Sequence, residues 1–168
     1  EGEFELWDEK EKAVCILRET GKKEFAINDQ AYEKFSQHIG HYPCVIIAPD
    51  DIQIITDGSE QRRKFIDTLL SQLSPDYLQQ LITYNKILQQ RNSLLRSFSE
   101  NRNKDLSLLN VLDEQLIKPG EKIFARRKEF LVGFLPLVKQ LYNEISEQFE
   151  NVNLFYESEL LHATFPEL

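Results

Sequence analysis

Two long segments with helical periodicity, joined by a short polar stretch, constrain the fold of this chain most strongly. The first runs from Pro75 to about Phe98, with Ser74 at the N-cap position and proline at the first helical position. The second runs from Leu106 to about Phe149. Because only residues 99–105 (SENRNKD) separate them, the two helices should pack side by side as an antiparallel hairpin.

Proline occurs at two points of the second helical segment. Pro119-Gly120 is expected to interrupt it and Pro136 to kink it, because proline lacks a backbone N–H and its ring crowds the preceding turn. A shorter helix is expected to begin after the Asp57-Gly58-Ser59 turn. Its apolar face consists of Phe65, Ile66, Leu69, Leu70 and Leu73.

The N-terminal part of the chain has the patterns of short strands. Residues 3–8 and 13–18 are expected to form a β-hairpin, and residues 23–28 a third strand after the turn at Gly21. Residues 30–38 are expected to form a short helix that ends before Gly40.

Two more strands are predicted, one on each side of the helices. Residues 44–48 (CVIIA) form a continuous apolar run, typical of a strand that is buried on both faces. Residues 152–158 (VNLFYES) alternate and are expected to return to the same sheet. The predicted organisation is a strand-rich part over 1–57, a helical arm over 58–150 and a returning strand over 151–168.

Charge limits the classes of function. The chain has 28 acidic and 20 basic residues, a net charge of −8 that argues against simple nucleic-acid binding. The acids gather at the ends, since residues 1–35 hold ten acids and six bases and residues 143–168 hold six acids and no bases. The segment between them has a net charge of +2, which allows a phosphate-facing surface there.

Composition adds further limits. No apolar run has the length of a membrane span, and the acidic start lacks the pattern of a signal peptide. The absence of methionine, even at position 1, leads us to expect an internal segment of a longer protein. Cys15 and Cys44 are expected to be buried, reduced thiols of a cytoplasmic protein. His38 and His41 have no third ligand at metal-binding spacing, so no metal site is predicted.

No catalytic residue is predicted either. The chain contains no GxxxxGK[ST] loop, LSGGQ-like signature, GxSxG, HExxH or CxxC. Arg62 and Arg63 lie early in a helix, where the helix dipole disfavours cations, so the pair invites a phosphate or carboxylate partner. The alternative is a solvated face or an ion pair with Asp57 or Glu60.

Two further groups could contact a ligand. Asp50 and Asp51 follow the apolar run and Pro49, where a carboxylate could bind a metal ion or could simply cap a turn. The densest basic run has a net charge of +4 and could contact a nucleic-acid backbone or form a solvated helix face. Its bases are Lys118, Lys122, Arg126, Arg127 and Lys128.

Several of these blocks resemble the RecF family of bacterial DNA-repair ATPases. They cover nearly the whole chain: APDDI (48–52), GSEQRRKFID (58–67), LITY (81–84), QRNSLL (90–95), LDEQL (112–116) and RRKEF (126–130). Three positions depart from the family pattern, because Asp50 stands where glutamate is usual, Ala48 replaces serine and Pro119 is an added proline.

The resemblance implies an α+β fold, with part of the antiparallel sheet of an ABC-type, SMC-like head and a long antiparallel helical arm, or lid, inserted in it. It implies that Pro49 and Asp50 lie near ATP and Mg²⁺, as in a Q-loop. It also implies that Arg62, Arg63, Lys118, Lys122, Arg126, Arg127 and Lys128 face DNA or another phosphate.

The longer protein would be a weak ATPase of recombinational repair and replication restart in the bacterial cytoplasm, with a part in the SOS response. It would bind DNA at single-strand/double-strand junctions, dimerise on ATP, and load RecA together with RecR-type partners. This segment alone would need no cofactor and catalyse nothing. A second hypothesis comes from a different class: a non-catalytic helical interaction or dimerisation module, for which amphipathic helices suffice.

Overall fold

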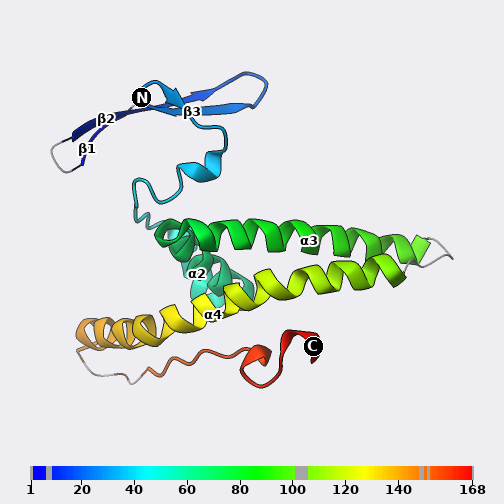
Figure 1. The fold of residues 1–168 in the computed structure, drawn as a ribbon. Coiled ribbons are helices and arrows are strands. Elements are labelled where there is room, and N and C mark those ends of the chain that lie inside the picture. Colours follow the sequence, from blue (N-terminus) through cyan, green and yellow to red (C-terminus); the bar gives the residue numbers. More distant parts are fainter. Residues whose placement is uncertain (1, 7–8, 101–105, 148–149, 151, 168) are drawn as a thin grey trace.

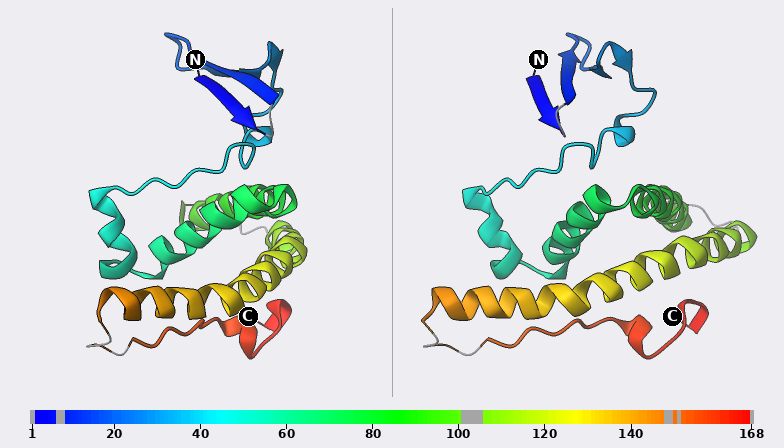
Figure 2. Two further views of the ribbon diagram at one scale, coloured as in Figure 1. Left: turned by 90° about the vertical axis from the view of Figure 1, so that its left-hand side faces the viewer. Right: turned by 60° about the vertical axis from the view of Figure 1, so that its left-hand side comes forward.

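The computed structural model describes residues 2–6, 9–100, 106–147, 150 and 152–167 (Figure 1). A small sheet at the N-terminal end is followed by three packed helices, and the C-terminal segment lies along the last helix. An extended stretch leads from the sheet to the helices (Figure 2).

The sheet has four antiparallel strands in chain order: β1 (Gly2–Leu6), β2 (Glu9–Leu17), β3 (Lys23–Ile27) and β4 (Gln30–Ala31). Its turns have the residues that left-handed backbone requires, with Gly21 at φ 80° and the Asn28-Asp29 pair at φ 48° and 64°. The three strands predicted over 3–8, 13–18 and 23–28 are confirmed within the described residues, and residues 7–8 of the first prediction lie outside them.

Aromatic and histidine rings pack beside the sheet. The Phe25 and His38 ring centroids lie 3.9 Å apart, and those of Phe4 and Tyr42 lie 4.0 Å apart. The helix predicted over 30–38 is wrong: Gln30 and Ala31 pair with β3, and only η1 (Phe35–Gln37) is helical. Here strand pairing replaces the local helical preference.

The helical part begins with η2 (Pro49–Ile52) and α1 (Gln53–Thr56), which form one continuous helical segment before α2 (Ser59–Leu73). The predicted hairpin then follows as α3 (Pro75–Glu100) and α4 (Leu106–Ile145), which run antiparallel (Figure 1). None of the helices in the described ranges is long and apolar enough to cross a membrane.

The helices meet in one apolar core. Its buried members come from α2, α3 and α4, and Tyr77 is only 1% exposed. They are Ile66, Leu70, Tyr77, Ile123 and Leu131, with Leu81, Tyr84, Phe130, Phe134, Leu135 and Tyr156 packed against them. Because each fully buried apolar side chain contributes roughly 2 kcal/mol, this cluster stabilises the unit more than helix propensity does.

The predicted interruption of the second helix is wrong, because α4 continues through both Pro119 and Pro136. Figure 2 shows that the helix changes direction along its length. Pro119 and Gly120 are buried, and a Cβ on Gly120 would lie 2.3 Å from the ring of Phe165. Gly120 therefore makes room for the C-terminal segment, and tertiary packing outweighs the local cost of proline.

The strand predicted over 152–158 is also wrong, since residues 152–158 have no strand pairing and run along α4 (Figure 2). Lys139 Nζ donates to Asn153 Oδ1 at 2.9 Å, and the ring of Tyr156 stacks on Phe124 with centroids 6.3 Å apart. The segment ends in η3 (Glu159–Leu161) and η4 (Phe165–Glu167). Side-chain packing on the hairpin replaces the predicted sheet pairing.

The predicted buried strand at 44–48 is neither a strand nor buried in this chain. Val45, Ile46 and Ile47 are 86%, 79% and 88% exposed. Cys15 and Cys44 are free but exposed, so the prediction that they are buried is wrong. The segment is anchored at its start, where Cys44 N donates to Gln72 Oε1 at 3.1 Å.

Candidate functional site

Pro49 and Asp50 lie on the surface, at the end of the exposed apolar stretch. Pro49 opens η2, and its missing N–H costs nothing in the first turn. Asp51 accepts a hydrogen bond from Ala48 N at 2.7 Å, so it closes the turn, while Asp50 is exposed. Asp50 therefore has the geometry to meet a ligand, and its role near ATP and Mg²⁺ stays a prediction.

Arg62 contacts neither Asp57 nor Glu60 through a carboxylate. Its Nη1 donates to the carbonyl oxygens of Ile54 and Asp57, at 3.1 and 2.9 Å, so it satisfies backbone groups where α1 ends. Arg63 Nη1 donates to Ser59 Oγ at 2.8 Å and is exposed. The structure thus separates the pair: Arg62 holds a turn, and Arg63 faces solvent.

The basic run over 118–128 is not one continuous surface. Arg126 pairs with Glu129 at 2.5 Å, and Lys128 Nζ lies 6.0 Å from the centre of the Phe124 ring. Lys118 and Lys122 are exposed one turn apart on α4. Arg127 turns inward.

Arg127 belongs to a three-residue polar cluster, which we call the Asp67–Tyr77–Arg127 triad, that joins α2, α3 and α4. Its Nη2 and Nε donate to the two carboxylate oxygens of Asp67 at 2.7 and 2.8 Å, and Tyr77 OH donates to Asp67 Oδ1 at 2.5 Å. The side chains of Arg127 and Asp67 are only 19% and 16% exposed. A bidentate pair in this environment is a structural tie.

The electrostatics favour a charged Arg127. Burial is the largest single influence on its pKa and would lower it, but the charges and hydrogen bonds of Asp67 and Tyr77 together outweigh burial and raise the pKa. Burial, followed by the hydrogen bond to Asp67, raises the pKa of Tyr77 above its ordinary value. Arg127 is therefore no free phosphate contact. A carboxylate beside the apolar positions Ile66 and Leu70 of α2 was the signal in the sequence that could have pointed to this tie.

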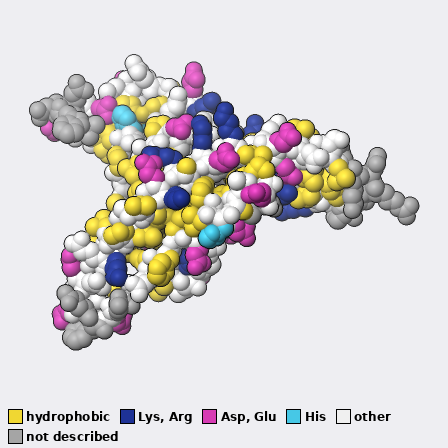
Figure 3. Space-filling view, turned by 60° about the horizontal axis from the view of Figure 1, so that its bottom comes forward, with side chains coloured by type: hydrophobic (Ala, Val, Ile, Leu, Met, Phe, Trp, Pro, Cys, Tyr) yellow, Lys and Arg dark blue, Asp and Glu magenta, His cyan; other side chains and the backbone are white. Residues whose placement is uncertain are grey.

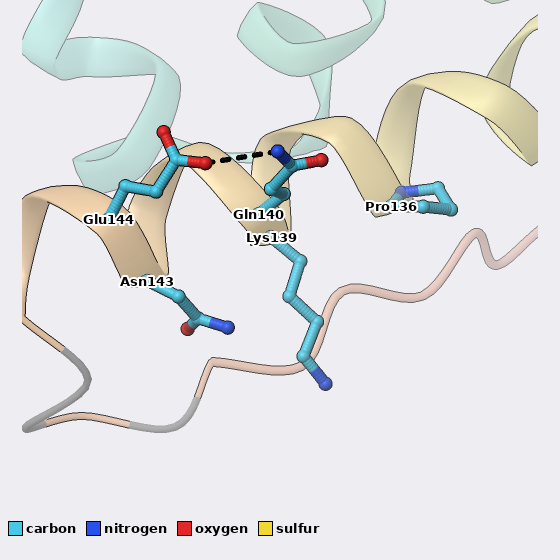
Figure 4. Close-up of a pocket in the computed structure, with 5 residues that line it drawn as sticks. All are labelled: Pro136, Lys139, Gln140, Asn143 and Glu144. Carbon is cyan, nitrogen blue, oxygen red and sulfur yellow. Dashed lines mark hydrogen bonds between the residues drawn. The ribbon is translucent and has the colours of Figure 1, made fainter.

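No enclosed active site is formed by the hollows we find. The hollow in Figure 4, of about 430 Å³, is lined by one face of α4. Its lining residues are Pro136, Lys139, Gln140, Asn143 and Glu144. Gln140 Nε2 donates to Glu144 Oε1 at 2.9 Å, and Lys139 Nζ donates to Asn153 Oδ1, so three of the four polar side chains that line the hollow already have partners. Within the described residues, no three His, Cys, Asp or Glu gather as metal ligands.

The surface charge is mixed on the face shown in Figure 3, where acidic and basic side chains are interspersed and hydrophobic side chains gather over the middle. A different surface was missed by sequence reasoning. A second shallow hollow, of about 360 Å³, runs along α3 and is lined by Asn85, Leu88, Gln89, Asn92, Ser93 and Arg96. Because most of these side chains are uncharged, this surface does not appear as a basic run in the sequence. Only the absence of acidic residues in this part of α3 could have indicated it.

The sequence of this chain is similar to those of curated relatives. It is 46% identical over 160 residues to the DNA replication and repair protein RecF of Flavobacterium johnsoniae, covering 95% of this chain and 45% of the relative. It is 42% identical over 150 residues to RecF of Phocaeicola vulgatus, covering 89% of this chain and 40% of the relative. No protein-family model matches the chain.

Solved structures agree. The recombination mediator protein RecF–ATPrS of the RecFOR pathway superposes with a TM-score of 0.75 at 32% identity, covering 82% of this chain and 37% of that chain. The RecF–ATP structure of the same pathway gives a TM-score of 0.75 at 30% identity, covering 90% and 42%.

An antiparallel sheet followed by a long helical hairpin is thus the α+β arrangement of an ABC-type head segment with its arm, and the predicted fold class is confirmed. These relatives and solved structures confirm the resemblance that the motifs indicated: over nearly its whole length the chain is similar to a segment of RecF proteins. It spans less than half the length of the curated relatives it matches, 45% and 40% for the first two.

Proposed function

We propose that the chain is the segment of a RecF-like protein that joins part of its head to its arm, and that this protein acts with ATP and DNA in recombinational repair and replication restart. The observation that carries the proposal is the match to RecF over 95% of the chain. By analogy, the longer protein dimerises on ATP, recognises single-strand/double-strand junctions, loads RecA with RecR-type partners and takes part in the SOS response in the bacterial cytoplasm.

The exposed stretch at 45–47 supports a place in a larger sheet. Three β-branched residues in a row, each more than three-quarters exposed, are costly in water and suit a strand with neighbours on both sides. The relatives are more than twice the length of the matched segment, so they contain residues that can supply those neighbours. We infer that residues 1–57 belong to the head and the helices from 58 onward to the arm.

Hydrolysis of ATP, which is weak, belongs to the longer protein. Pro49 and Asp50 follow the exposed stretch directly, so they would lie at the edge of the completed sheet, within reach of Mg²⁺·ATP. Asp50 would act through its carboxylate as a ligand of Mg²⁺ or of a metal-bound water. Arg63 remains an exposed candidate for a phosphate contact in this protein, whereas Lys118 and Lys122 are exposed on α4 within about one turn of Glu114 or Glu121.

Two measurements test the proposal. The coding sequence ahead of this segment should contain a GxxxxGK[ST] loop within about a hundred residues, and its absence would overturn the RecF assignment. In the longer protein, Asp50→Asn should weaken Mg²⁺-dependent ATP binding by about tenfold. Asp51→Asn is the matched control, because an amide oxygen can still accept the hydrogen bond from Ala48 N.

A second candidate function is a non-catalytic dimerisation module, which one observation favours. Leu137, Leu141 and Ile145 lie at successive turns of α4 and are 50%, 48% and 85% exposed. If this stripe joins two copies, Leu137→Glu with Leu141→Glu should convert a dimer to a monomer in analytical ultracentrifugation. Arg62→Glu with Arg63→Glu should leave that dimer intact, and a dimer lost only in the arginine variant would contradict this interface.

A further inference from the structure

The solvent-facing side of α3 has an unusual charge for this chain. Residues 77–98 contain three bases and no acid, although the whole chain holds 28 acids and has a net charge of −8. Their exposed positions over successive turns carry amide, hydroxyl and basic groups, which we call the amide stripe: Asn85, Lys86, Gln89, Asn92, Ser93 and Arg96. Every one of these side chains can donate a hydrogen bond, and none repels an anion.

The opposite helix of the hairpin differs. On α4 exposed acids and exposed bases are interspersed: the acids are Glu114, Glu121 and Glu129, and the bases are Lys118, Lys122, Arg126 and Lys128. Each base there has a carboxylate within about one turn, so the field along α4 changes sign repeatedly. A polyanion lying along the hairpin would meet continuous donors on α3 and alternating charges on α4.

Arg91 differs from the other two bases of α3 in its position. Arg91 pairs with Asp113 of α4 and so ties the two helices together near their far end. The three bases of α3 therefore divide by role, with Arg91 between the helices and Lys86 and Arg96 on the exposed side. Amides fill the intervening turns, as in the shallow hollow lined by Asn85, Gln89, Asn92 and Ser93.

We propose that the amide stripe of α3 is a contact surface for the sugar–phosphate backbone of duplex DNA. The stripe is about 17 Å long at 1.5 Å per residue, enough to follow roughly five base pairs of one strand. Amides, a hydroxyl and two cations donate to phosphate oxygens without reading bases, so the contact is independent of sequence. This inference rests on the proposed function, which gives the protein a DNA partner, and it assigns that contact to α3 in place of the 118–128 run.

The test compares two matched variants of the full chain. Lys86→Glu with Gln89→Glu places two carboxylates three residues apart on α3. Lys118→Glu with Gln115→Glu makes the same chemical change, at the same spacing, on exposed positions of α4. Binding to a fluorescein-labelled 20-base-pair duplex is followed by anisotropy from about 50 to 200 mM salt. Circular dichroism confirms that both variants keep their helices.

The proposal expects the α3 variant to bind at least about tenfold more weakly, with a salt dependence smaller by about one released ion, and the α4 variant to bind like the parent chain. A larger loss in the α4 variant, or equal losses, would overturn the stripe and leave the DNA role intact. No salt-dependent binding by the parent chain would overturn both. Altered sedimentation of the α3 variant without DNA would assign the stripe to contacts between protein copies.

Discussion

Arg127 shows how a single residue can belong to the interior although its sequence neighbours suggest a surface. It lies in the densest basic run of the chain, yet its guanidinium binds Asp67 and Tyr77 between three helices. The sequence indicates that Arg127 is a charged residue on a helix. It does not indicate that the Arg127 side chain points inward, because its direction depends on which face of α2 packs against α4. The basic run was therefore correctly found as a helix segment and incorrectly treated as one surface.

Removal of this guanidinium should cost stability. Arg127→Met leaves the Asp67 carboxylate partly buried without its cation, and we expect the free energy of unfolding to fall by about 3 kcal/mol in urea titrations. Arg126→Met is the matched control, because the Arg126–Glu129 pair is exposed and should contribute less than about 0.5 kcal/mol. Equal effects of the two substitutions would show that the triad is no tie.

His38 should make the stability of the chain depend on pH. Its Nδ1 is buried without a hydrogen bond, and burial, followed by the charge of His41, lowers its pKa from 6.5. The unfolded chain therefore binds a proton at a higher pH than the folded chain does. Stability from neutral His38 is fully present above pH 6.5 and is lost as the pH falls through the folded pKa.

Thermal unfolding between pH 7 and pH 5 measures this effect. The melting temperature of the parent chain should fall over this range, while His38→Phe, which keeps an aromatic ring beside Phe25, should show a flatter profile. His162→Phe is the control, since His162 is exposed near the end of the chain. A His38→Phe profile parallel to that of the parent would contradict this role.

At the scale of elements, helices were easier to predict than strands. The helix periodicity of α2, α3 and α4 lies within each segment, so their positions could be read from the sequence. A strand needs a neighbour to complete its hydrogen bonds. The runs at 44–48 and 152–158 have strand patterns but no pairing in this chain, whereas β1, β2 and β3 pair with adjacent hairpin partners.

The proline prediction failed for a related reason. Pro119-Gly120 has a strong local tendency to end a helix, by about 3 kcal/mol for proline. Tertiary contacts outweigh that cost, because Ile123 and Leu131 of α4 are buried in the core formed with α2 and α3, and the ring of Phe165 packs against Gly120. Family resemblance did not help here, since the proline is itself a departure from the pattern.

Two glycines of α4 should respond oppositely to the same change. Gly133→Ala meets no atom within 4 Å and should stabilise the chain by about 0.5–1 kcal/mol through helix propensity. Gly120→Ala places a methyl group 2.3 Å from the Phe165 ring, so it should destabilise the chain by about 1 kcal/mol and increase hydrogen exchange over residues 156–167. In a Phe165→Ala background, Gly120→Ala should become stabilising, and a persistent loss there would contradict the packing explanation.

At the scale of the whole molecule, substitutions in the apolar stretch at 45–47 should have different effects on stability in this chain and in the proposed longer protein. Val45→Thr with Ile47→Thr should change the unfolding free energy of this chain by less than about 0.5 kcal/mol, because both side chains already face water. In the longer protein the same pair should cost about 3 kcal/mol if a sheet buries both side chains.

Ile66→Thr provides the reference for that comparison. Ile66 lies in the helical core, so this substitution should destabilise both proteins. Chemical denaturation of the two proteins side by side makes the measurement. Equal, small effects of Val45→Thr with Ile47→Thr in both would rule out a strand at this position.

The composition of α3 also determines how the molecule ages. Hydrolysis of a side-chain amide releases ammonia and leaves a carboxylate, so an Asn or Gln becomes an Asp or Glu without any change in the gene. At Asn85, Gln89 or Asn92, this reaction would place the first acid among residues 77–98, which contain none. Prolonged storage at high pH and temperature would therefore add negative charges to this face, one for each amide hydrolysed. Peptide mass spectrometry could follow each conversion as a mass increase of about 1 Da.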